Sequence, residues 1–295
     1  MVLAKIYFLP LAVFILLPGT FILTYVISIL LRDVEVEFPY ISDTGTYVPE
    51  SCIFGQLLNL VASLIAATVY VRYKQVEQYY RDHLSNESRL VLRLNVVGLW
   101  LGCTAAFGVS LVANFQETSV FIVHMIGAMM AFGIGMLYAW LQTVMSYYMF
   151  PLVNSLLVAR LRLVLSIVST VCFIILNVAT PISLKQFHGK DKTKWYPKDG
   201  GFASHVISTV SEWILALAFD LYFLSFVREL QNITMASPKV IFLTEETGMS
   251  STSDIYHSED NLEVAFPQSH GSMGSVATET VNSINSVTTE AIIHR

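Results

Sequence analysis

Apolar residues along the chain gather in six long runs that are separated by polar segments. The runs cover about residues 6–31, 52–71, 94–113, 119–145, 161–183 and 204–227. A helix needs about 20 mostly apolar residues to cross the hydrocarbon core of a bilayer, and each run has about that length. The pattern predicts an all-α polytopic membrane protein with six transmembrane helices and a disordered C-terminal tail.

The first run could be mistaken for a signal peptide, because Lys5 precedes it. Its 26 residues exceed the roughly 7–15 of a signal-peptide core, and no convincing small-x-small cleavage site follows. The run contains Pro10 and Pro18, which membrane helices tolerate better than soluble helices do. We therefore predict an uncleaved first helix.

Composition agrees with the membrane assignment. Hydrophobic residues make up 54% of the chain and charged residues only 13%, whereas soluble domains carry roughly 25% charge. This excludes a disordered chain, a nucleic-acid binder and a secreted disulfide scaffold. Cys52, Cys103 and Cys172 lie in or beside apolar runs without the spacing of a metal or redox site, so we interpret them as packing residues.

Charge is distributed unevenly along the chain. Residues 1–228 hold 15 basic and 13 acidic residues, a balance of +2, whereas residues 229–295 hold 2 basic and 9 acidic, a balance of −7. We therefore predict a six-helix transmembrane domain over 1–228 and an acidic, Ser/Thr-rich cytosolic tail over 229–295, mostly disordered. Phosphorylation of Ser251, Ser253 or Ser258 would add to the acidity of this tail.

Lysine and arginine near the helix ends indicate the orientation, because they favour the cytosolic side. With a cytosolic N-terminus, that side carries Lys5, Arg72, Lys74, Arg81, Arg89, Arg93, Arg160, Arg162 and Arg228. The opposite side carries Arg32, Lys185, Lys190, Lys192, Lys194 and Lys198. Nine against six favours cytosolic N- and C-termini. The sequons at Asn86 and Asn232 would then face the cytosol, and their glycosylation would overturn this orientation.

Only residues 114–118 join the third and fourth runs, which predicts a tight antiparallel hairpin. Both runs carry small residues at every fourth position: Gly98, Gly102, Ala106 and Ser110 in one, and Gly127, Ala131, Gly135 and Ala139 in the other. Such spacing lets helix backbones approach closely. Two interpretations stay open, a dimer face and packing within the bundle.

Ionisable groups inside membrane helices are costly and indicate function by default. In the fourth run, His124 and Gln142 are eighteen residues apart, five α-helical turns, which predicts one shared face. The sixth run carries a polar stripe: His205, Ser208, Glu212 and Asp220. This stripe fits a proton relay, a lipid head-group site, a catalytic set or a buried hydrogen-bond network. The sequence has no motif typical of a catalytic centre, a metal site, a phosphate loop or a channel filter.

The first loop, residues 32–51, is acidic and rich in turn-forming residues between Pro39 and Gly45. We expect it to cap the non-cytosolic mouth of the bundle. Its carboxylates could bind calcium, but their spacing is unlike that of an EF-hand.

Several short segments are specific enough to indicate a family. They are PYISDTG at Pro39–Gly45, Pro49-Glu50, Phe54-Gly55, YVRYKQV at Tyr70–Val76, VANFQ at Val112–Gln116, Gly127, Trp195-Tyr196-Pro197, Ser211-Glu212-Trp213 and Phe226-Val227-Arg228. With them the chain resembles the DRAM family, the damage-regulated autophagy modulators, within the wider Frag/DRAM/Sfk group. The resemblance covers nearly all of residues 1–235, and YVRYKQV is more similar to the second DRAM protein than to the first.

The resemblance implies a six-helix protein of lysosomal or late-endosomal membranes, linked to autophagy and to cell death after damage. It implies no catalytic residue, metal or cofactor, and its expected partners are membrane lipids and autophagy or lysosomal membrane proteins. Signature or candidate functional residues are Tyr40, Ser42, Asp43, Gly45, Glu50, Asn114, Gln116, His124, His205, Glu212 and Trp213. The leading hypothesis is a non-enzymatic regulator. The alternatives are a lipid-binding or lipid-remodelling protein and an ion or proton channel or transporter.

Overall fold

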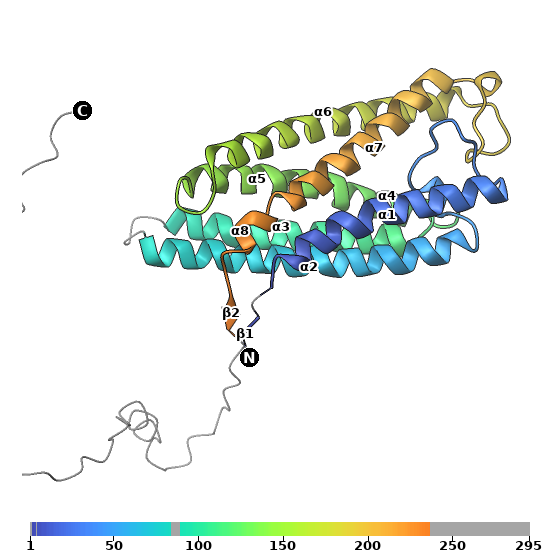
Figure 1. The fold of residues 1–295 in the computed structure, drawn as a ribbon. Coiled ribbons are helices and arrows are strands. Elements are labelled where there is room, and N and C mark those ends of the chain that lie inside the picture. The colour runs from blue at the N-terminus through green and yellow to red at the C-terminus, as the bar shows by residue number, and fades with distance from the viewer. Residues whose placement is uncertain (1, 4, 84–88, 237–295) are drawn as a thin grey trace, which may run out of the picture. The chain divides into compact units, whose positions relative to one another are not determined.

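A computed structural model describes residues 2–3, 5–83 and 89–236, and it confirms six helices that are long and apolar enough to cross a membrane (Figure 1). The spans are α1 (Phe8–Leu31), α2 (Glu50–His83), α3 (Arg89–Asn114), a composite of α4 (Phe121–Ala128), η2 (Met129–Ile134) and α5 (Gly135–Tyr148), then α6 (Leu156–Gln186) and α7 (Phe202–Leu224). The short helix α8 (Val227–Leu230) extends the last span.

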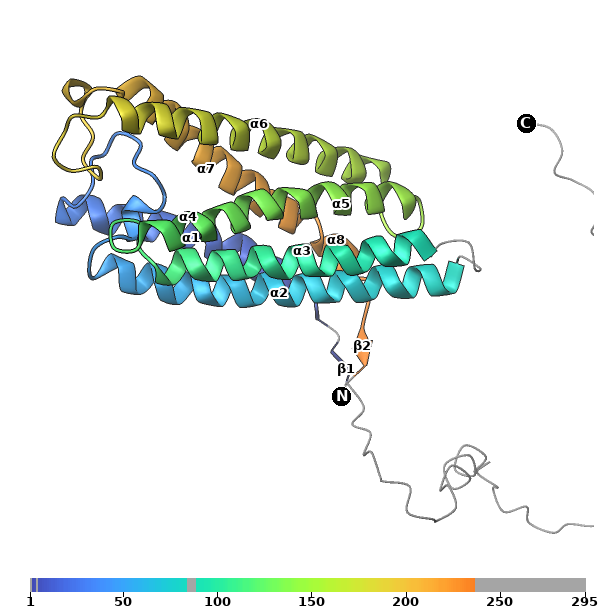
Figure 2. The ribbon, with the colours of Figure 1, turned by 180° about the vertical axis from the view of Figure 1, so that it is seen from behind.

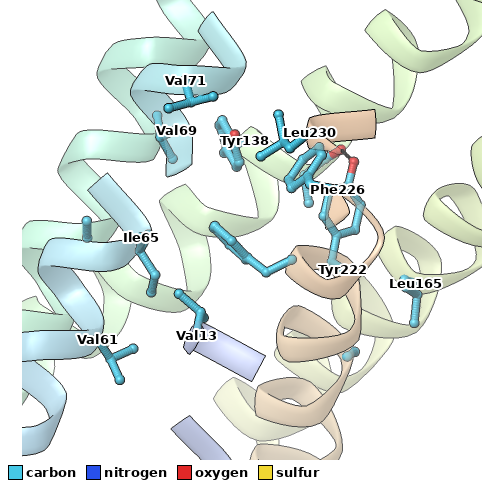
Figure 3. Packing of buried hydrophobic residues seen from close by; sticks show 14 of the residues in the cluster. Val13, Val61, Ile65, Val69, Val71, Tyr138, Leu165, Tyr222, Phe226 and Leu230 are labelled. Atoms are coloured by element: carbon cyan, nitrogen blue, oxygen red, sulfur yellow. Dashed lines mark hydrogen bonds between the residues drawn. The ribbon is translucent and has the colours of Figure 1, made fainter. Parts of the chain in front are cut away.

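The six spans form a closed ring. Going around it, α1 packs against α2, α2 against α3, α3 against the fourth span, α5 against α6, α6 against α7, and α7 against α1 (Figures 1 and 2). Val13, Val61, Val69, Tyr138 and Phe226 belong to the main apolar core inside this ring (Figure 3). All six spans contribute residues to this core.

Helix α1 shows how a membrane span inverts the pattern of a soluble helix. Its buried face carries Thr20, Thr24 and Ser28 at four-residue spacing, whereas Ile22 and Leu30 are exposed on the outer surface. The buried hydroxyls donate to backbone carbonyls within the helix, as Thr20 Oγ1 does to Leu16 O at 2.7 Å. Lipid is as apolar as leucine, so small polar residues are free to occupy the inner face.

The small residues of α3 and the fourth span pack inside the chain. A side chain at Gly127 would lie 3.0 Å from the carbonyl oxygen of Gly108, and one at Gly102 would lie 2.6 Å from Val69. At these positions the close approach joins helices of the same bundle. This agrees with the intramolecular interpretation of the stripe.

The fourth span is not a uniform α-helix, because η2 is a π-helical segment. It lies between His124 and Gln142, so the count of five regular turns does not apply to them. Both residues are buried, but His124 bonds to Phe115 and Gln142 to Arg72. The structure therefore does not join them into one polar site.

Two two-residue strands supplement the all-helical fold. β1 (Val2–Leu3) pairs antiparallel with β2 (Met235–Ala236), so the first residues and the segment after α8 lie side by side. Glu229 and Leu230, assigned from the sequence to the tail, are buried in the bundle. The remaining tail predictions, the phosphorylation sites among them, and the Asn86 sequon fall outside the described residues, whereas Asn232 is exposed.

Candidate functional site

The first loop forms a buried plug at one end of the bundle. Residues 40–46 are all buried, and Asp43–Gly45 forms a 3-10 turn, η1. Within the loop, Tyr40 N donates to Asp43 Oδ2 at 3.3 Å, and Thr44 Oγ1 donates to Ile41 O at 2.7 Å. Gly45 is required by a close approach, because a Cβ there would overlap the Phe54 ring.

Helix α7 holds this plug through both of its signature residues. Glu212 Oε2 accepts a hydrogen bond from Ile41 N at 2.8 Å, and Trp213 Nε1 donates to Pro39 O at 3.0 Å. Tyr40 OH bonds to Ser208 Oγ and to Thr180 Oγ1, so its ring is fixed between α6 and α7. The predicted cap and the predicted stripe are therefore one assembly.

His205 is a packing residue of the same assembly. Its ring stacks on Trp195 at a centroid distance of 4.2 Å and meets Tyr40 edge-on at 5.2 Å. Ser208 Oγ donates to the backbone oxygen of His205 and not to its ring. The pair thus lacks the hydroxyl-to-imidazole contact that nucleophilic catalysis needs.

Below the plug lies an apolar cavity of about 120 Å³ inside the ring. Glu212, Ser42 and His124 line its upper part, and Tyr138 and Phe223 line its floor. The remaining lining is apolar and comes from α1, α2, α3, the fourth span and α7. The cavity therefore has one polar end and one apolar end.

A second cavity of about 120 Å³ adjoins the first. It shares Ser42, His124 and Glu212 with the apolar cavity, and adds Tyr40 and Glu117. Its outer wall is formed by residues of α4, η2 and α6: Met125, Ala128, Met129, Phe132, Phe173, Leu176, Asn177, Thr180 and Pro181. The shared polar residues, together with Glu117 of the second cavity, make a polar junction between the two cavities, hereafter the head site: Ser42, Glu117, His124 and Glu212.

The head site presents hydrogen-bond acceptors and lacks a cation. Ser42 Oγ donates to Glu117 Oε2 at 2.8 Å, and His124 Nδ1 donates to Phe115 O at 2.8 Å, which leaves Nε2 of a neutral imidazole as an acceptor. No Lys or Arg is among the residues that line either cavity. Within the described part of the chain, neither Glu117 nor Glu212 forms an ion pair.

The plug itself carries a strongly perturbed carboxyl group. Burial raises the pKa of Asp43 well above its usual range, and the nearby carboxylates of Glu117 and Glu212 raise it further. Burial also raises the pKa of Tyr40 to about 12, so this phenol stays protonated and can donate. Acidic conditions therefore favour the buried position of Asp43.

Comparison with known proteins assigns the chain to a family. Residues 5–233 match the family model described as the Frag1/DRAM/Sfk1/Cwh43P N-terminal domain. The chain belongs to this family. It is 42% identical over 231 residues to DNA damage-regulated autophagy modulator protein 2 of Rattus norvegicus, which covers 77% of this chain and 85% of the relative.

Two further relatives extend the comparison. DNA damage-regulated autophagy modulator protein 1 of Homo sapiens is 41% identical over 218 residues, covering 74% of this chain and 87% of the relative. Modulator of macroautophagy TMEM150B of Danio rerio is 30% identical over 204 residues, covering 68% and 74%. No solved structure matches the chain. The match spans all six helices, so the DRAM-family resemblance read from the sequence is confirmed.

Three other signature residues of this DRAM-family chain lie away from the head site. Asn114 exchanges hydrogen bonds with Asn59 at 3.0 and 3.1 Å, which ties α3 to α2. The backbone oxygen of Gln116 accepts from Ser119 N at 3.1 Å and so shapes the α3–α4 turn. Glu50 lies in the first turn of α2, where a helix N-terminus favours a carboxylate. Their positions indicate structural roles.

Asp220, the last member of the predicted stripe, also lies apart. It is buried near Leu17 and Pro18 of α1, and neither carboxylate oxygen has a hydrogen-bond partner among the described residues. The described residues contain no group of His, Cys, Asp and Glu arranged to hold a metal. The stripe thus divides into a part that contacts the plug, His205, Ser208 and Glu212, and an isolated carboxyl group, Asp220.

Sequence reasoning missed a buried cluster at the opposite end, hereafter the clamp: Arg72 of α2, Arg162 of α6 and Glu229 of α8. Both arginine side chains are 0% exposed, and each forms an ion pair with Glu229, at 2.7 Å for Arg162. Arg72 also donates to Gln142 and Gln75, and Arg162 to Ser146 and Ser225. From the sequence, both arginines served as indicators of orientation and Arg72 also as part of the YVRYKQV signature, whereas Glu229 counted only as tail charge.

Proposed function

We propose that this chain is a multi-pass protein of the lysosomal membrane that promotes autophagy and damage-linked cell death without catalysing a reaction. The observation that carries this proposal is the 42% identity over 231 residues to a relative named as a DNA damage-regulated autophagy modulator. The match includes every span, the plug and the head site. Its partners would be membrane lipids and autophagy or lysosomal membrane proteins.

The geometry supports a binding role better than a catalytic one. Ser208 and His205 do not form a nucleophile–base pair, and the head-site carboxylates face an apolar cavity. Because α7 holds the plug, a ligand bound in that cavity can change the position of the plug and of the loops around it.

The orientation that we propose places both termini and the clamp in the cytosol and the plug on the far side. It rests on the excess of lysine and arginine at the clamp end. The exposed Asn232 sequon would then stay unglycosylated, and a protease tag at residue 36 would be cleaved only from the luminal side. Glycosylation of Asn232 in cells would contradict the orientation.

The function is tested in cells that lack the protein, by measuring degradation of an autophagosome-bound reporter. Loss should lower autophagic flux, and re-expression of the wild type should restore it. Glu212→Ala should restore it poorly, whereas Asp220→Asn, an equally buried carboxyl outside the head site, should restore it. Unchanged flux on loss of the protein, or turnover of membrane lipids by the purified protein, would contradict the proposal.

The second candidate function is lipid binding or lipid remodelling, and the two cavities favour its binding form. Their joined lining, polar at one end and apolar at the other, matches the chemistry of an amphiphile. An ion or proton pathway has less support. The Asp, Glu and His residues that line the apolar cavity, Glu212 and His124, both lie at the head site, and the lining from there to Tyr138 contains none.

A further inference from the structure

The apolar cavity has the depth of a single lipid chain. On α7 its lining runs from Glu212 through Ala216 and Phe219 to Phe223. These eleven steps correspond to about 16 Å of helix at 1.5 Å per residue. That is about half of the ~30 Å hydrocarbon core, the depth that one chain occupies in one leaflet. At about 120 Å³ the cavity is small, so we match it with one chain.

The head site selects the polar group at the end of that chain. Glu212 is only 8% exposed, and its Oε1 has no hydrogen-bond partner among the described residues. His124 Nε2 and the second oxygen of Glu117 are further acceptors beside it. A ligand that satisfies three acceptors must bring hydrogen-bond donors, and an ammonium group carries three.

The charge of the head site also favours a ligand with a cationic group. Buried carboxylates in proteins are paired with cations or bound to metals, because an uncompensated buried charge is costly. The clamp obeys this rule within the chain, since Glu229 has Arg72 and Arg162. At the head site the described chain supplies no Lys or Arg; the basic group there, His124, is bound through Nδ1 to Phe115 O, and the described residues form no metal cluster.

We propose that the two cavities bind a single-chain amphiphile with a primary amine head, a long-chain amine. The ammonium contacts Glu212, Glu117 and His124 at the head site, and the alkyl chain lies along α7 toward Tyr138 and Phe223. This ligand class rests on the second candidate function, lipid binding, and it does not require the role in autophagy.

The second cavity, which includes Tyr40 and Glu117, also offers a route from the bilayer. Its outer wall lies between the fourth span and α6, where Met129 and Asn177 are exposed on the lipid side. An adjoining open groove on the outer face of the fourth span shares Met125, Met129 and Phe173 with it. An amphiphile can therefore enter sideways from the membrane, while the plug closes the aqueous end.

The head-group selection is tested with three probes of equal chain length, dodecylamine, dodecanol and dodecanoate. The full-length protein in phosphatidylcholine nanodiscs is titrated, and binding is read from native mass spectrometry and thermal unfolding. We expect dodecylamine to bind about tenfold or more tightly than dodecanol, and dodecanoate not to bind, because charge-assisted hydrogen bonds favour the amine. Equal binding of all three would show simple partitioning and overturn the proposal.

Variants then locate the site. Glu212→Gln keeps the shape of the side chain and should abolish the preference for amine over alcohol, and Glu117→Gln should weaken it. Asp220→Asn, a buried carboxyl outside the cavities' polar junction, should leave the preference unchanged. If Glu212→Gln fails to fold, Glu117→Gln alone decides. A preference that survives in the folded head-site variants, or that is lost in Asp220→Asn, overturns the assignment.

The chain cavity is tested by filling it. Gly135 lines the cavity and has ordinary contact distances around it, 3.6 Å to Phe219, whereas Gly19 faces outward with nothing within 4 Å. Gly135→Leu should weaken dodecylamine binding about tenfold and hexylamine binding less, and Gly19→Leu should change neither. Equal losses for both chain lengths would overturn the proposed placement of the chain. A different result would count against the autophagy role alone: the wild type binds the amine, and head-site variants that have lost this binding still support normal autophagic flux.

Discussion

The two ends of the bundle bury carboxylates of the same kind in opposite ways. At the clamp, Glu229 lies between Arg72 and Arg162, and nearby hydroxyl and amide groups accept further hydrogen bonds from the two arginines. Arg72 Nη2 has no hydrogen-bond partner among the described residues. At the plug, Asp43, Glu117 and Glu212 lie close together. No Lys or Arg lines either cavity, and the basic side chain in the two linings is His124.

This difference separates a structural solution from a functional one. A carboxylate that is paired with cations of the chain itself fixes how helices pack and needs no ligand. A cluster that lacks its counter-charge beside a cavity remains ready for a ligand. Two regions with similar residue types therefore have different roles, and the distinction lies in which partners the fold supplies.

The largest expected effect comes from breaking the clamp. Glu229→Ala leaves two fully buried guanidinium groups without an anion, which should cost about 3–5 kcal/mol of unfolding free energy. Denaturant unfolding in detergent measures it. The control is Glu77→Ala, which removes partly exposed pairs with Lys74 and Arg81 and should cost less than about 1 kcal/mol. Equal losses in the two variants would show that the clamp is not what holds this end.

The next effect concerns the fit of the plug. Gly45→Ala places a methyl group on the Phe54 ring and should cost about 1–3 kcal/mol through overpacking. Gly19→Ala meets nothing and should be neutral or slightly stabilising. Limited proteolysis of the first loop should follow the same order. A Gly45→Ala loop that resists protease as the wild type does would contradict tight seating against Phe54.

A smaller effect is the pH dependence of the plug. The pKa of Asp43 is raised in the folded state, so its contribution to stability is complete below the unfolded pKa and is lost as the pH rises through the folded value. The wild type should therefore lose stability relative to Asp43→Asn as the pH rises from the unfolded pKa of about 4 to the raised folded value, by about 1.4 kcal/mol per unit of pKa shift. Parallel stability curves for the two proteins would disprove this.

The smallest effect concerns Asp220, which lies between the two ends and belongs to neither. Its carboxylate has no hydrogen-bond partner among the described residues and borders an apolar pocket. Asp220→Leu should stabilise the fold by about 1 kcal/mol, because it removes an unsatisfied buried polar group. Thermal unfolding provides the measurement. Destabilisation would mean that this carboxyl group has a hydrogen-bond partner when the protein is in the membrane.

Hydropathy predicted the six spans because a backbone in lipid must satisfy its own hydrogen bonds, and long apolar helices are the means. It underestimated α2, which continues to His83 although its second half is polar. Glu212 was identifiable because a carboxyl inside a span is costly. Glu117 resembled an ordinary loop residue, and its place in the head site depends on the position of Ser42, 75 residues earlier.

The clamp was not predictable, because its members come from three distant segments and only the ring of helices brings them together. The π-helical segment was equally hidden, since its residues MMAFGI are apolar and fit a regular helix as well. Local patterns thus determined the elements, while contacts between distant segments determined the charge pairing.

The π-helical turn also gives the family a simple genetic route to change its site. Removing one residue from η2 would restore α-helical geometry and rotate α4 by about 100° relative to α5. His124 would leave the head site while Gln142 kept its bond to Arg72. A single-codon deletion would therefore turn all the α4 residues that line the cavities, His124, Met125 and Ala128, away from their present positions.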